Sequence, residues 1–253
     1  MAFPVCGRVP VGRRPAHNLI AGWQAILRPR LLWPAVMTVA MVALTLALGV
    51  WQVRRLEWKT ALLAEIDRGE AAEPVALAPV PRPFSRVRVT GDLLPGQALY
   101  GTEVRGTRTG IAMGAQAIQP LQLADGRIVL IDRGWVPEDT AQLPVGPVTI
   151  TAYVRPPEYP VRFGAADNPA TRRFYALDPV AIGSALGIAS PAPFTLVALG
   201  PDRPGEVPAP ATVLPRPVNN HLAYAVTWFA FAVCALAVFA VYARQALRPR
   251  ETA

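Results

Sequence analysis

The chain has 253 residues, of which 52% are hydrophobic and only 17% are charged. This length suits one ordinary domain with a few additional elements and excludes a multidomain enzyme, while so apolar a composition points to segments that cross a bilayer. The formal net charge is +8, but residues 31–243 hold 17 bases against 16 acids, so the excess lies at the two ends and does not indicate a nucleic-acid partner.

Residues 1–30 are predicted to be an arginine-rich cytoplasmic tail, followed by a first transmembrane helix over residues 31–53. That helical segment carries no charged side chain and exceeds the roughly 20 residues that a span needs. A cleaved signal peptide has a shorter apolar core, and no convincing cleavage site follows. The acid-free, arginine-rich start would also suit a mitochondrial transit peptide, whereas the near absence of lysine, with Lys59 alone, favours a GC-rich bacterial genome.

Residues 54–216 are predicted to form a β-rich α+β domain outside the cytoplasm, beginning with a helical continuation of the first span over residues 58–73. Six short runs have strand character and are separated by clusters of glycine and proline. These runs are 86–89, 98–104, 111–123, 127–136, 148–154 and 194–199. Their spacing favours an antiparallel sheet or an open barrel.

One helix of this domain is predicted over residues 179–186, with Asp178 as its N-cap and Gly187 at its end. Residues 200–217 are rich in proline and glycine, which predicts a linker that returns the chain to the membrane.

A second transmembrane helix is predicted over residues 219–242, which carry no formal charge, and a second cytoplasmic tail over residues 243–253. Bases in both tails favour cytoplasmic termini and a periplasmic domain. Three bases just after the first span oppose this orientation: Arg54, Arg55 and Lys59. Long domains, however, translocate largely regardless of charge.

The chain contains only two histidines and two cysteines, too few for a typical metal centre. No histidine lies in residues 54–216 to activate a nucleophile, and the glycine-rich nucleotide motifs are absent. We therefore expect a protein that is not an enzyme: a binding module, a chaperone or a scaffold. Catalysis by carboxylates alone is the enzymatic alternative.

Three stretches carry polar and aromatic residues where apolar residues would suffice. Residues 49–59 read GVWQVRRLEWK, residues 129–137 read VLIDRGWVP, and residues 219–229 read NNHLAYAVTWF. In the first, three side chains share one helix face: Trp51, Arg55 and Trp58. In the last, one helix stripe is aromatic above and small below: His221, Tyr224, Ala225, Trp228, Ala232 and Ala235. Taken by itself, the stretch 49–59 is typical of an aromatic belt with a basic anchor at a membrane surface.

Together these stretches resemble the Surfeit locus protein 1 family of cytochrome c oxidase assembly factors. The patterns are G-x-W-Q-x-x-R-x-x-W-K, R-G-[WF]-V-P and N-H-x-x-Y-x-x-x-W-[FY], and residues 87–91, 167–169 and 174–175 add to the likeness. The resemblance implies a bacterial inner-membrane protein with its domain in the periplasm, or a mitochondrial inner-membrane protein in a eukaryote. It also implies transient binding of haem a and aid to its insertion into the oxidase catalytic subunit. The implied partners are membrane lipid, that subunit and haem a synthase.

By position, His221 corresponds to the family's proposed haem ligand. A neutral imidazole can ligate iron, an aromatic ring can stack on the porphyrin, and an arginine can pair with its propionates. The predicted haem-binding residues are His221, as iron ligand, Tyr224, Trp228, Trp51 and Arg55, with Arg216 as a second candidate for the propionates. Fold or partner contacts are predicted for Trp58, Arg133, Gly134 and Trp135.

Two alternatives stay open. His221 could simply lie in the headgroup region, with Asn219 or Asn220 capping the helix. The protein could also be a scaffold that stabilises an oxidase assembly intermediate without binding haem.

Overall fold

The computed structural model describes residues 29–107, 110–201 and 203–248. The chain divides into two compact units, a helical unit within residues 1–58 and 219–253 and a β-rich unit, Lys59–Val218. Most of the predicted tail 1–30 and the end of the tail 243–253 lie outside the described residues.

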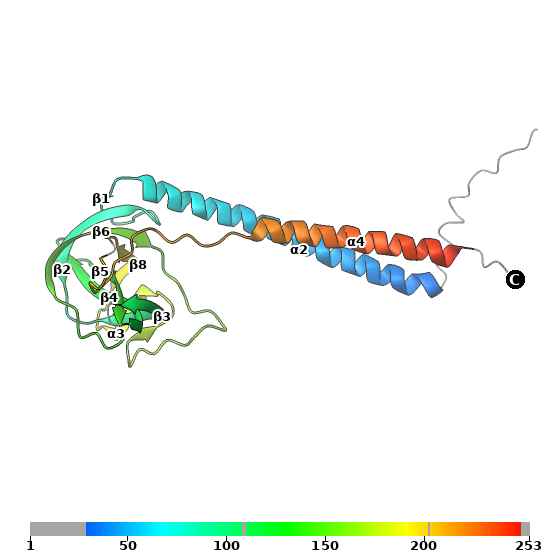
Figure 1. The fold of residues 1–253 in the computed structure, drawn as a ribbon. Coiled ribbons are helices and arrows are strands. Elements are labelled where there is room, and N and C mark those ends of the chain that lie inside the picture. The colour runs from blue at the N-terminus through cyan, green and yellow to red at the C-terminus, as the bar shows by residue number, and fades with distance from the viewer. Residues whose placement is uncertain (1–28, 108–109, 202, 249–253) are drawn as a thin grey trace, which may run out of the picture. The chain divides into compact units, whose positions relative to one another are not determined.

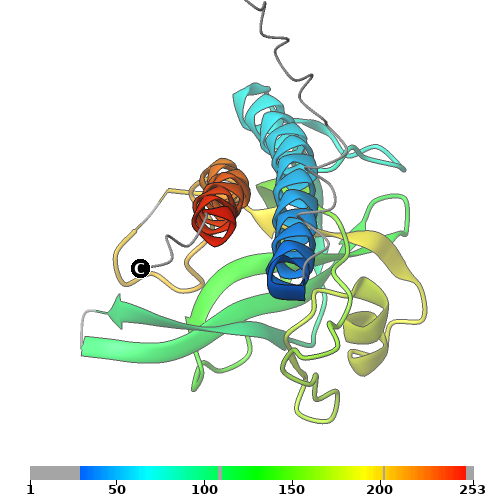
Figure 2. The ribbon, with the colours of Figure 1, turned by 90° about the vertical axis from the view of Figure 1, so that its right-hand side faces the viewer.

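The helical unit consists of the first part of α2 (Pro29–Ala71) and of α4 (His221–Leu247), which run antiparallel and side by side (Figures 1 and 2). Both helices are long and apolar enough to cross a membrane. The prediction of two transmembrane helices that flank a β-rich domain is confirmed. Helix α2 also continues to Ala71 without a break, as the amphipathic pattern after residue 58 predicts.

The β-rich unit holds eight strands and one short helix among its described residues. They are β1 (Val75–Ala76), β2 (Arg86–Leu93), β3 (Ala98–Thr107), β4 (Gly110–Leu123), β5 (Ile128–Pro137), β6 (Gly146–Arg155), β7 (Arg173–Phe174), α3 (Pro179–Ala185) and β8 (Pro191–Ala198). Each of the six predicted runs overlaps one of these strands, and two of the runs extend one residue beyond it, at Arg127 and at Leu199. The two-residue strands β1 and β7 were not predicted, because so short a segment carries no periodicity.

The sheet is a closed barrel, whereas the sequence predicts an antiparallel sheet or an open barrel. Strands β2, β6, β8, β5 and β4 form a ring that closes where Gly91–Leu93 of β2 pairs with Leu121–Leu123 of β4. Strands β5 and β8 are parallel. The chain passes from β5 to β8 through β6, β7 and α3, and parallel strands require such a crossover, which strand patterns do not reveal.

Strand β5 lies between two layers of the core. Val129 and Ile131 point into the barrel interior, and Leu130 between them packs in the cluster formed with α3. This double burial explains why β5 is a continuous apolar run rather than an alternating one. Helix α3 begins as predicted, because the Asp178 carboxylate accepts a hydrogen bond from the Val180 N–H at 2.9 Å.

The segment 200–217, which is predicted to be a linker, packs against the barrel. Leu214 is fully buried with Ile66 of α2 in a third hydrophobic cluster. Ala209 pairs with Trp135 through two backbone hydrogen bonds of 2.9 Å. Proline and glycine prevent regular structure here, but apolar side chains and isolated backbone pairs still hold the segment to the barrel.

Candidate functional site

The contact between α2 and α4 is a seam of small and buried residues. On α2, Thr45, Gly49 and Gln52 recur at spacings of four and three and are buried. On α4, Ala225 is 2% exposed, and a Cβ atom on Gly49 would lie only 2.7 Å from Cε1 of the Phe229 ring. Small residues let helix backbones approach closely in a membrane, where packing rather than the hydrophobic effect drives association.

His221 is the first residue of α4 and forms the polar end of this seam. Its Nδ1 lies 2.7 Å from Oε1 of Gln52, which is buried on α2. With the amide oxygen assigned to this contact, Nδ1–H donates and Nε2 keeps its lone pair. Within the described part of the chain, His221 has no other polar partner. A histidine oriented through one nitrogen, with the other available, has the form that metal-binding histidines take.

Helix capping by Asn220 does not explain the polar start of α4. Asn220 occupies the N-cap position, but its side chain makes no capping hydrogen bond. Oδ1 of Asn219 is buried and has no hydrogen-bond partner among the described residues.

The other predicted haem-binding residues lie beside the seam rather than in it. Tyr224 and Trp51 are 56% and 55% exposed, and Trp228 is half-buried with an edge contact to Phe231 at 5.9 Å between ring centres. At 100° per residue on a pair of antiparallel helices, Arg55 is expected on the same side of the seam as Tyr224 and Trp228. The guanidinium of Arg55 lies 3.9 Å from the centre of the Trp58 ring. The contacts seen for these residues are therefore within each helix: Arg55 with Trp58 on α2 and Trp228 with Phe231 on α4.

Arg133, Gly134 and Trp135 make contacts within the β-rich unit. Gly134 has a φ angle of +115°, and a Cβ atom there would collide with the carbonyl oxygen of Ala209. Arg133 donates to Oε1 of the buried Gln119 at 2.9 Å, and the Trp135 indole N–H donates to the Glu103 carbonyl at 3.1 Å. These residues are predicted to contact either the rest of the fold or a partner, and the contacts described here are within the fold.

A polar cavity of about 330 Å³ lies beside the same strand and was not predicted from the sequence. Its lining includes Asp132, Tyr153, Arg155, Glu103, Arg105 and Gln116. Asp132 is 2% exposed, and burial raises the pKa of its carboxyl to about 6. Burial also raises the pKa of Tyr153 to about 12.

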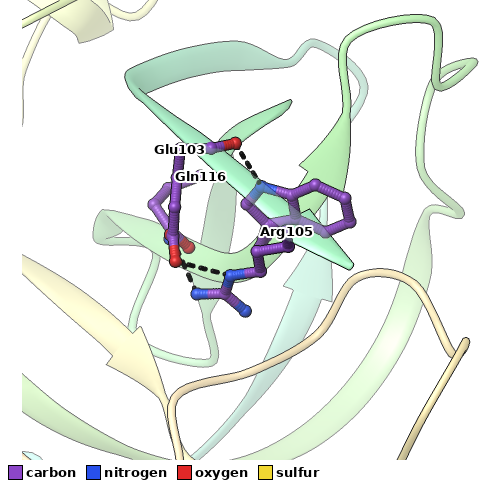
Figure 3. Close-up of polar contacts among 4 residues, drawn as sticks. Glu103, Arg105 and Gln116 are labelled. Atoms are coloured by element: carbon purple, nitrogen blue, oxygen red, sulfur yellow. Dashed lines mark hydrogen bonds and ion pairs between the residues drawn. The ribbon is translucent and has the colours of Figure 1, made fainter. Parts of the chain in front are cut away.

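Both arginines of this cavity have acidic partners. Arg155 donates to Oε1 of Glu158 at 2.7 Å and to the Tyr100 hydroxyl at 3.0 Å. Glu103 receives two hydrogen bonds from Arg105, of 2.7 and 2.9 Å, and one from Gln116 at 3.2 Å (Figure 3). Within the described residues, no group of three or more histidine, cysteine, aspartate or glutamate side chains could hold a metal ion.

Sequence reasoning missed Gln52 and Gly49, which are central to the seam. Each had a signal, since Gln52 is an uncharged polar residue within the first span and Gly49 weakens a helix interior unless packing requires it. The cavity had a fainter signal in Asp132, an acid that interrupts an apolar strand. Its partners come from other strands, so no local motif marks them.

Known proteins resemble this chain over most of its length. The SURF1 family pattern matches residues 39–233, which include all three motif stretches. A SURF1-like protein of Monosiga brevicollis is 30% identical over 237 residues, covering 85% of this chain and 88% of the relative. Surfeit locus protein 1 of Mus musculus is 29% identical over 214 residues, covering 74% of this chain and 68% of the relative. A SURF1-like protein of Rickettsia felis is 24% identical over 213 residues, covering 80% of this chain and 93% of the relative. Because the family match covers the barrel and reaches into both helices, the chain belongs to the SURF1 family.

Proposed function

We propose that this chain is an assembly factor for haem-copper cytochrome c oxidase that binds haem a transiently and aids its insertion into the catalytic subunit. Membership of the SURF1 family supports a role in oxidase assembly in general. The haem part of the proposal depends chiefly on the hydrogen bond between His221 and Gln52. It orients the imidazole and leaves Nε2 available as an iron ligand.

Haem a is the cargo in this proposal, and its iron supplies a centre that accepts the Nε2 lone pair. A single protein ligand gives weaker binding than two, which suits a carrier that must release. Tyr224 and Trp228 offer aromatic surface on one side of the seam, and Arg55 offers a cation there for a propionate. Arg216 is a weaker candidate, because Asp67, at 2.8 Å, and Glu70 already engage it.

The proposed location is a bacterial inner membrane, with the β-rich unit in the periplasm, or the inner membrane of a mitochondrion. The charge distribution supports this orientation, because the net positive charge is concentrated in the two tails. The proposed partners are membrane lipid, the oxidase catalytic subunit and haem a synthase. The protein would bind and present its cargo without catalysing a reaction.

The test is an optical spectrum of the full chain purified from cells that make haem a. We expect a haem a band in the native protein and in His17→Ala, which changes the other histidine of the chain. The band should be absent from His221→Ala. A native protein that is unpigmented, or a His221→Ala variant with an undiminished band, would contradict the proposal.

The scaffold alternative is favoured by one observation: the same hydrogen bond is a direct contact between α2 and α4. His221→Gln separates the two functions, because its amide can still bond to Gln52 but is a poor iron ligand. A carrier would lose both the haem band and oxidase assembly in this variant. A scaffold would retain oxidase assembly.

A further inference from the structure

The cavity of the β-rich unit contains one buried carboxylate that forms no ion pair with any described residue. Asp132 lines this cavity, and Oδ1 accepts a hydrogen bond of 2.9 Å from the Gly134 N–H. Among the described residues, that is the only hydrogen bond to its carboxylate, and no lysine, arginine or histidine forms an ion pair with it. A buried carboxylate normally has a cationic partner or several donors.

Arg155 and Arg105 attract the Asp132 carboxylate and lower its pKa, but neither forms an ion pair with it, because each is paired with another acid. Arg155 is paired with Glu158 and Arg105 with Glu103, both at 2.7 Å. Each of these pairs is electrically neutral, which leaves Asp132 as the acid of the cavity lining without an ion-pair partner. An anionic ligand would have to break one of these pairs, whereas a cationic ligand would complete the charge balance.

The remaining lining suits a cation with an apolar stem. Val197, Ala209 and Ala211 provide an aliphatic wall, and the buried ring of Tyr153 lies in the same cavity. Aliphatic surface packs against the methylenes of lysine or arginine, and an aromatic ring attracts their charged heads. The volume of about 330 Å³ lies at the lower end of known ligand pockets, roughly 300–1,000 Å³.

An open sheet edge lies next to the cavity. Strand β7 pairs with β3 only at Leu99 and Tyr100, while β4 covers the other side of β3. Beyond Tyr100, the edge of β3 that faces away from β4 has no neighbouring strand among the described residues. Glu103 and Arg105, which line the cavity, belong to this part of β3. An extended polypeptide can add to such an edge and place a side chain in an adjacent pocket.

We propose that this cavity binds the guanidinium or ammonium group of a basic side chain from a partner polypeptide, with Asp132 as its anionic partner. Val197, Ala209 and Ala211 then contact the stem of that side chain. The proposal concerns the β-rich unit alone and does not depend on haem binding at His221.

The test is calorimetric titration of the full chain in detergent micelles. The probes are N-acetyl-argininamide and N-acetyl-lysinamide, with neutral N-acetyl-glutaminamide as control and guanidinium chloride as a free small cation. Asp132→Asn removes the charge but keeps an acceptor for the Gly134 N–H. Asp125→Asn is the matched control, because Asp125 pairs with Arg127 in a turn outside the cavity.

We expect a capped cation to bind the native protein and Asp125→Asn, and to bind Asp132→Asn at least tenfold more weakly. Ala211→Leu, which fills the cavity without touching the carboxylate, should weaken binding as well. The proposal would be overturned if neither capped cation bound, or if a capped cation bound the native protein and both cavity variants with equal affinity. It would also be overturned if the neutral glutamine control bound as well as the capped cations. Binding of guanidinium but not of capped arginine would overturn the polypeptide source.

Discussion

Replacing Asp132 by asparagine should make the protein more stable at neutral pH. The carboxyl is buried, and its pKa rises from the ordinary value of 3.8 to about 6. A raised pKa means that the folded state disfavours the ionised form, so the native protein holds a proton that the unfolded chain has released between these two pKa values. Stability therefore falls as pH rises through this window, and the full penalty is present above pH 6.

The magnitude follows from the size of the shift. At about 1.4 kcal/mol for each tenfold change in proton affinity, the ionised Asp132 costs about 3 kcal/mol at pH 7.5 and less than about 1 kcal/mol at pH 4. Asparagine has no charge to desolvate and can keep the hydrogen bond to the Gly134 N–H. For a domain of this size, a gain of about 3 kcal/mol raises the Tm by roughly 6–12 °C.

The assay is thermal unfolding of the full chain in detergent, followed by circular dichroism at pH 7.5 and pH 4. Asp125→Asn is the control, since hydrogen bonds from Arg127 lower the pKa of this exposed carboxyl and its loss should bring no gain. The reasoning would be refuted if Asp132→Asn lowered the Tm at pH 7.5, or if its gain were the same at both pH values.

Three further predictions concern the seam and the barrel. Gly49→Leu should weaken the association of the two helices by about 1–3 kcal/mol through overpacking, and the protein should then unfold at a lower SDS concentration. Val50→Leu, at an exposed position of the same helix, should leave that SDS concentration unchanged. Gln52→Leu should lower haem a affinity about 10–100-fold in a spectral titration, because the imidazole loses its orienting partner. Gly134→Ala should lower the Tm sharply, while Gly106→Ala, where a Cβ meets open space, should change it little; equal effects would contradict the assigned strain.

The elements of the fold were predictable because their signals are local. Charge-free apolar runs marked both helices, and alternating or apolar runs between glycine and proline clusters marked the six longer strands. Closure of the barrel depends on the pairing of Gly91–Leu93 with β4, a contact between strands that are not adjacent in the chain. Periodicity carries no information about such pairing.

The candidate site shows the same division. The sequence pointed to His221 because its motif opens the second span, and to Trp51 and Arg55 because they leave the first. It could not show that Gln52, one position from Trp51, bonds to His221. Which residue of a helix turn faces the neighbouring helix depends on the packing of the pair, and here Gly49 and Phe229 determine it.

Asp132 links stability to the proposed cation site. Asparagine would fill the same volume, keep the hydrogen bond to Gly134 and remove a charge that costs about 3 kcal/mol when ionised. A buried carboxylate with no ion-pair partner among the described residues fits the proposed cationic side chain from another molecule. If so, the capped cation should raise the Tm of the native protein toward that of Asp132→Asn, and it should leave the Tm of the variant unchanged.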